Sequence, residues 1–117
     1  SSSRKPLLEA MNAYSAGKYT EALSAFSQLK QPSDTLAFYR ANALLATDQL
    51  VAARTEFERI SEQQGHPYKQ AGGWYLALID VREGDFSTAR ERLEAIGANK
   101  NHPFSKRTLD LLVKLPD

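Results

Sequence analysis

The chain has 117 residues, of which 42% are hydrophobic and 25% charged, and its 15 Lys and Arg against 14 Asp and Glu leave a net charge of +1. This composition is typical of one globular domain and excludes collagen-like and disordered classes, while the near-neutral charge removes the electrostatic case for nucleic acid or an acidic membrane as partner. The absence of cysteine excludes disulfides, thiolate zinc sites and a thiol nucleophile, and the longest apolar run, Trp74 to Ile79, is too short to cross a bilayer.

Three stretches of the chain repeat one amphipathic pattern, with apolar residues three and four positions apart. That spacing lines one side of an α-helix. A segment that is apolar nearly all round precedes each stretch, which predicts a helix covered on two sides: Leu7 to Tyr14, Leu36 to Leu45, and Trp74 to Val81. The amphipathic stripes themselves are Tyr19, Ala22, Leu23, Phe26 and Leu29; Leu50, Ala53, Phe57 and Ile60; and Phe86, Ala89, Leu93 and Ile96.

The breaks between these segments carry residues typical of helix ends. Gly17 and Gly84 can end a helix in the left-handed conformation, and Thr47-Asp48 and Asp85 offer side-chain oxygens to the start of the next helix. Pro32, Pro67 and Pro103 are expected in the first turns of the helices that follow. The chain is therefore predicted to be all-α, with helices at roughly 6–16, 19–30, 34–46, 49–63, 67–83, 86–97 and 103–115.

The small residues after the turns recur at a nearly constant spacing, because Ala22, Ala53 and Ala89 are 31 and 36 residues apart. Gly17-Lys18-Tyr19 and Gly84-Asp85-Phe86 precede two of these alanines. A helix–turn–helix unit of about 34 residues with such a turn resembles the tetratricopeptide repeat. The middle unit departs from that pattern with Asp48-Gln49-Leu50, and the third has Leu93 where the first two have Phe.

The resemblance implies a single domain over 1–117, built as a right-handed superhelical stack of three helix pairs at about 6–31, 34–64 and 67–98, and a capping helix at 103–115. Within that last helix, Leu109, Leu112 and Val113 are expected to cover the third pair. Its charged residues are expected to face water: Lys106, Arg107, Asp110 and Lys114.

Catalytic chemistry finds little support in the sequence. His66 and His102 each precede a proline at an expected helix start, where a turn or capping role explains them. The Gly72-Gly73 pair favours close approach to the preceding helix, with close approach of a ligand as the alternative. A basic cluster near the end of the chain (Lys100, His102, Lys106, Arg107) lacks the stacking aromatics of a nucleic-acid site. We expect no enzyme activity, catalytic residue, cofactor or metal.

In tetratricopeptide arrays the first helix of each pair lines a concave groove, so the resemblance implies a groove in this chain too. Its expected lining is unusually apolar for a surface that meets water, which favours an interface for a protein or peptide. Another interpretation buries part of this set, Trp74 in particular, beneath neighbouring helices. The expected groove residues are Leu7, Met11, Tyr14, Phe38, Asn42, Leu45, Trp74, Leu78, Val81 and Arg82.

The leading functional hypothesis is thus a non-catalytic module that binds a peptide or helix of a partner protein, and the alternative is self-association through the same surface into a homo-oligomer. The family's carboxylate clamp for chaperone tails is not expected, because Leu7, Met11, Tyr39, Ala71 and Tyr75 stand in its places. The Trp-Tyr-Leu-Ala-Leu and His-Pro-Phe segments resemble C-terminal repeats of membrane-anchored bacterial proteins. That resemblance favours an excised periplasmic domain whose tether precedes Ser1.

Overall fold

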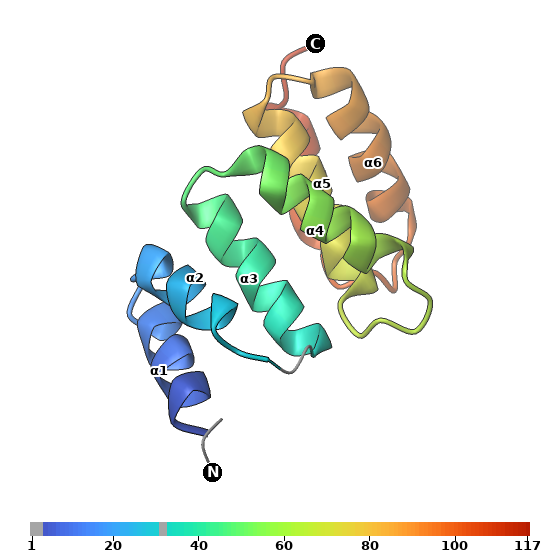
Figure 1. The fold of residues 1–117 in the computed structure, drawn as a ribbon. Coiled ribbons are helices and arrows are strands. Elements are labelled where there is room, and N and C mark those ends of the chain that lie inside the picture. Colours follow the sequence, from blue (N-terminus) through green and yellow to red (C-terminus); the bar gives the residue numbers. More distant parts are fainter. Residues whose placement is uncertain (1–3, 31–32) are drawn as a thin grey trace. The chain divides into compact units, whose positions relative to one another are not determined.

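The computed structural model describes residues 4–30 and 33–117, and within them all regular secondary structure is helical. The seven helices of this part are α1 (Arg4–Ser15), α2 (Tyr19–Ser27), α3 (Asp34–Ala46), α4 (Leu50–Glu62), α5 (Lys69–Arg82), α6 (Phe86–Ala98) and α7 (Ser105–Lys114) (Figure 1). The all-α prediction is confirmed, with most helix bounds within two residues of those expected. The chain divides into two compact units, Ser1–Glu56 and Phe57–Asp117, and the division falls inside α4.

The first unit is built on the packing of α1 against α2 and of α2 against α3. Ala10 of α1 and Ala22 of α2 are fully buried, and Phe26 is 6% exposed. Small side chains allow two helices to approach closely, while the phenyl ring fills the next layer of the core. The stripe predicted for this helix is therefore the one that the core uses.

The second unit packs α5 against α6 and α6 against α7. Ala77 of α5 and Ala89 and Leu93 of α6 are fully buried in its core. Gly72 of α5 lies against the end of α4, since a Cβ atom added to it would meet Ile60 Cγ2 at 3.1 Å and Phe57 O and Ser61 N at 3.3 Å. The predicted close approach at this glycine is confirmed.

In a second close approach, between α6 and α7, the glycine lies on the earlier of the two helices. Gly97 of α6 lies against Thr108 of α7, with its added Cβ 3.3 Å from Thr108 Cγ2. Gly97 follows Ser61 by 36 residues, and Thr108 follows Gly72 by the same number. The glycine thus belongs to the later helix in the first contact and to the earlier helix in the second.

The helix ends follow the predicted chemistry with one correction. Gly17 and Gly84 have φ of 77° and 79°, and Asp48 holds the same place in the middle turn with a φ of 62°. Asp85 Oδ1 accepts a hydrogen bond from Thr88 N at 3.2 Å, so it caps α6 as expected. Thr47 instead directs its hydroxyl back to the carbonyl oxygens of Ala43 and Leu44, at 2.9 and 3.1 Å, and so completes the end of α3.

The expected helix starts at the prolines are partly wrong. Pro32 lies outside the described residues, and Ser33 caps α3 by accepting a hydrogen bond from Leu36 N at 3.0 Å. Pro67 and Pro103 lie in turns, two residues before α5 and α7 begin. The reason is that each preceding histidine bonds the amide of the aromatic residue after the proline, which makes that residue the N-cap.

The prediction for the capping helix is partly wrong: Leu112 packs on the second unit as expected, but Leu109 and Val113 do not form the buried stripe. Leu109 is 55% and Val113 86% exposed, whereas Thr108 and Leu115 are buried. Leu111 and Leu112 pack partly buried against the core of the second unit, which gives α7 a buried face at positions 108, 111, 112 and 115. The added Cβ of Gly97 lies 3.3 Å from Thr108 Cγ2 and 3.4 Å from Leu109 Cδ2, so Thr108 is buried against α6 while Leu109 touches α6 only at its edge. Lys106, Arg107, Asp110 and Lys114 are exposed, as predicted.

Candidate functional site

The groove residues of the first unit lie on α1 and α3. Tyr14 of α1 stands at the centre of an aromatic cluster, with its ring centroid 4.9 Å from that of Tyr39, 5.5 Å from Tyr19 and 6.4 Å from Phe26. The pair of Tyr14 and Tyr39 brings α1 and α3 into contact. We call this set the tyrosine cluster.

Around the tyrosine cluster, the predicted residues keep part of their surface in water. Leu7 is 39% exposed, and its neighbour Leu8 is 59% exposed. Met11, Tyr14, Phe38, Asn42 and Leu45 are half-buried. These helices therefore present apolar surface that the first unit does not cover.

Asn42 is the polar member of this set. Its Nδ2 donates a hydrogen bond to Phe38 O at 3.0 Å within α3. An amide has a second N–H and an acceptor oxygen, so this bond uses a quarter of its capacity. Asn42 can thus still bond the backbone of a bound segment.

The groove residues of the second unit are placed differently, and the assignment of Trp74 to an open groove is wrong. Trp74 is 6% exposed, and its ring stacks on that of Phe104 with centroids 5.2 Å apart and planes 5° from parallel. Leu78 and Val81 pack partly buried against the same core, and Arg82 is exposed. The physical reason is that the segment entering α7 lies over α5 and covers the indole.

Two features of the second unit were not found from sequence. Arg92 Nε on α6 donates a hydrogen bond to Asp80 Oδ2 on α5 at 2.9 Å, and the Asp80 side chain is only 1% exposed. An acidic residue directly after the apolar run of α5 was the available signal for such a pair. Thr108 Oγ1 is buried without a hydrogen-bond partner among the described residues.

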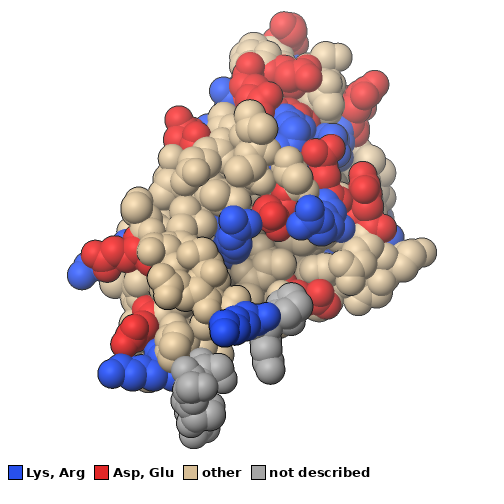
Figure 2. All heavy atoms as spheres, in the orientation of Figure 1, with Lys and Arg blue, Asp and Glu red and all other residues tan. Residues whose placement is uncertain are grey.

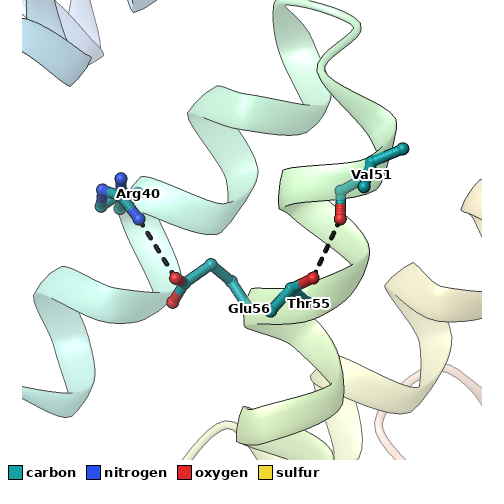
Figure 3. A network of polar contacts seen from close by, with 4 residues as sticks. All are labelled: Arg40, Val51, Thr55 and Glu56. Atoms are coloured by element: carbon teal, nitrogen blue, oxygen red, sulfur yellow. Dashed lines mark hydrogen bonds and ion pairs between the residues drawn. The ribbon is translucent and has the colours of Figure 1, made fainter.

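Charges of both signs are interspersed on the face of the molecule that Figure 2 draws, with Lys and Arg next to Asp and Glu. An ion pair of this mixed kind joins α3 to α4 in the first unit. Arg40 Nη1 lies 3.1 Å from Glu56 Oε1, and one residue before Glu56 the Thr55 hydroxyl donates to Val51 O at 3.2 Å (Figure 3). The ion pair joins two helices and the hydrogen bond lies within one, so both have structural roles. The exposed aromatic surface of the first unit is therefore the candidate site.

An open hollow of about 650 Å³ lies in the second unit beside the turn between α5 and α6. Arg90 Nη2 donates to Pro116 O at 2.7 Å across it, and Asp85 caps α6. Within 4–30 and 33–117, no three His, Asp or Glu side chains gather closely enough to hold a metal ion. Arg90 and Asp85 therefore have local structural roles at this hollow.

Comparison with known proteins gives no match. No family model matches the chain, and no curated protein or solved structure shows significant similarity to it. None of the helices that the structure describes is long and apolar enough to span a bilayer. The case for function thus depends on the surfaces described above.

Proposed function

We propose that this chain is a non-catalytic interaction module of tetratricopeptide-like helix pairs, which binds a peptide or a helix of another protein through α1 and α3. The observation that carries the proposal is the exposed apolar surface of the first unit, where Leu7 is 39% and Leu8 59% exposed on α1 and where Tyr14 of α1 and Phe38 of α3 are half-buried. Contiguous apolar and aromatic side chains rimmed by polar residues are typical of protein interfaces. Burial of Trp74 limits the proposed surface to residues of the first unit.

The aromatic residues suit the centre of such an interface. Tyr and Phe lose little conformational entropy when they are fixed, and large aromatic anchors dominate binding energies at interfaces. Tyr14 is already held by three aromatic neighbours, so its ring is positioned before any partner arrives. Asn42 supplies a polar group beside them for the backbone of the bound segment.

A peptide-display library selected on the whole chain tests this proposal. Leu7→Ser and Phe38→Ala should each weaken selected peptides by tenfold or more, about 1.4 kcal/mol, as truncation at an interface centre commonly does. Val51→Ser is the matched control, because Val51 is 82% exposed on α4 and lies outside the proposed surface. Selected peptides that bind both variants as well as the original chain would contradict the proposal.

The second candidate function is self-association, and one observation favours it. Leu109 and Val113 stand one turn apart on α7, 55% and 86% exposed. If a second copy covers them, sedimentation should show mass rising with concentration, and Val113→Ser should lower that mass. A constant monomer mass would exclude this candidate and leave the peptide-binding proposal intact.

A further inference from the structure

Two His-Pro-aromatic segments, 36 residues apart, begin α5 and α7 in the same way. His66 Nδ1 accepts a hydrogen bond from Tyr68 N at 3.0 Å, and His102 Nδ1 accepts one from Phe104 N at 3.1 Å. Each imidazole therefore accepts a hydrogen bond from the amide two residues further on, just before the helix begins, as Asp and Asn side chains do in Asx-turns. A histidine differs from those residues because it gains a proton near neutral pH.

The second nitrogen of His102 makes a contact with another helix. Nε2 lies 3.1 Å from the carbonyl oxygen of Gln70 on α5. Since Nδ1 accepts from an amide, the neutral ring must carry its hydrogen on Nε2, where it donates to that carbonyl. One neutral tautomer thus satisfies both contacts and joins the start of α7 to α5.

The residue held by His102 also covers the indole of Trp74. Phe104, whose amide bonds His102, places its ring on Trp74 at a centroid distance of 5.2 Å. Trp74 is 6% exposed with this cover in place. Anything that releases Phe104 therefore changes the environment of the indole.

We propose that His102 is a proton-sensitive latch, which holds the start of α7 over α5 when neutral and releases it when protonated. A proton on Nδ1 removes the acceptor for Phe104 N and sets one N–H against another. The contact of Nε2 with Gln70 can persist, so the change is centred on the N-cap of α7. Acidification loosens this helix start and uncovers Trp74.

The surroundings of the ring favour its neutral form. On α7 the Arg107 guanidinium carbon lies 5.6 Å from the centroid of Phe104, which places a cation near the latch. On α5, the titratable side chain in contact with Phe104 is Tyr75, with ring centroids 6.2 Å apart. Burial raises the pKa of its phenol and Arg107 opposes that shift, so Tyr75 stays uncharged near neutral pH. No ion pair in the described part of the chain involves His102.

Burial lowers the pKa of His102, and the hydrogen bond to Gln70 partly opposes this. A histidine with a lowered pKa binds fewer protons when folded than when unfolded. Stability therefore holds above the ordinary pKa of about 6.5 and declines as the pH falls through it. The pH window of the latch begins there and extends to lower pH.

Trp74 is the only tryptophan in the chain and reports on the latch directly. Between pH 8 and pH 5 its emission should shift to the red with a midpoint below about 6.5. His102→Asn keeps an acceptor for the amide two residues on but cannot titrate, so its emission should stay unshifted. His102→Ala should be red-shifted already at pH 8. A wild-type spectrum that ignores pH, or an equal shift in His102→Asn, would overturn the proposal.

The matched control is His66→Asn, which replaces the imidazole of the equivalent segment and should leave the wild-type shift in place. If this variant abolishes the shift, the proposal for His102 is wrong. Nitrogen-15 NMR of the unmutated chain tests the latch without any substitution. We expect the Nε2–H tautomer at pH 8 and, after correction for intrinsic rates, exchange of the Phe104 amide roughly fivefold faster at pH 5, as loss of one hydrogen bond implies. An Nδ1–H tautomer would refute it.

Discussion

Phe38 in the first unit and Trp74 in the second stand at the same point of the repeat, 36 residues apart, and each is followed by a tyrosine. Phe38 is half-buried, whereas Trp74 lies under Phe104 with 6% of its surface exposed. The two residues occupy equivalent sequence positions, but only Trp74 is covered by Phe104. Trp74 belongs to the core and Phe38 to the surface because Phe104, 30 residues after Trp74, covers the indole.

The ion pairs of the two units show the same contrast in burial. Arg40 pairs with Glu56 in the first unit and Asp80 with Arg92 in the second, and Arg92 follows Glu56 by 36 residues. The equivalent position therefore carries opposite charge in the two units. The acid of the first pair is 17% exposed and that of the second 1%, so the two pairs differ in how much their loss should cost.

The largest expected effect is that of Trp74→Ala, which tests whether Trp74 is buried and Phe38 is not. It should lower the free energy of unfolding by about 3–5 kcal/mol, because it leaves a cavity beneath Phe104. Phe38→Ala should cost clearly less, since water already reaches that ring. Denaturation midpoints in urea, followed by circular dichroism, measure both. Equal costs would show that the two positions are buried alike.

Arg92→Met tests the second comparison, because it removes the guanidinium that bonds the buried carboxylate of Asp80. We expect a loss of about 3 kcal/mol, at the low end for such pairs because Arg92 is 36% exposed. Adding Asp80→Leu, the residue of the first unit at this position (Leu44), should recover most of the loss. A double variant as unstable as Arg92→Met would mean that Asp80 matters for other reasons.

A smaller effect is expected where α5 meets the end of α4. Gly72→Ala should cost about 1–2 kcal/mol, because the new methyl group meets backbone atoms of Phe57 and Ser61 that cannot yield. Gly73→Ala is the matched control: nothing lies within 4 Å of its added Cβ, so it should stabilise the helix by about 0.5–1 kcal/mol. Thermal unfolding of both variants distinguishes contact from helix propensity, and a stabilising Gly72→Ala would exclude the contact.

The smallest effect belongs to the exposed ion pair. Arg40→Met should lower the free energy of unfolding by less than about 1 kcal/mol, since Arg40 is 44% exposed and solvent screens the pair. The difference from the unmutated chain should shrink further in high salt. A loss as large as that of Arg92→Met would remove the distinction between the two pairs.

The helices and most of their buried stripes could be predicted, because a 3.6-residue apolar period and glycine turns are local signals. The middle turn shows how far this extends: Asp48 takes the left-handed conformation of Gly17 and Gly84, although its residue type departs from the pattern. The sequence predicted only a side-chain role for Asp48, so its backbone conformation is a finding of the structure.

Two features could not be obtained this way, because they depend on residues distant in sequence. The buried face of α7 includes Thr108, whose polarity hides it from an apolar pattern and which lies against Gly97 on another helix. Of the candidate site, the members on α1 and α3 keep exposed surface, but Trp74 does not. Phe104 covers Trp74 through a tertiary contact, which the helical periodicity of the sequence does not predict.

The reversed glycine contacts bear on how such a chain can be recombined. Gly72 lies against Ile60 and the backbone of Phe57 and Ser61, and Gly97 lies against Thr108 and Leu109, so each glycine is matched to one particular neighbouring helix. A chimera that moved α4 into the place of α6 would set Ser61 against Thr108, with a side chain on both sides where one is accommodated now. Moving α4 together with α5 would preserve the match. The unit that can be exchanged is therefore the pair of helices that share a glycine contact. A chimera whose boundary separates these two helices loses that contact.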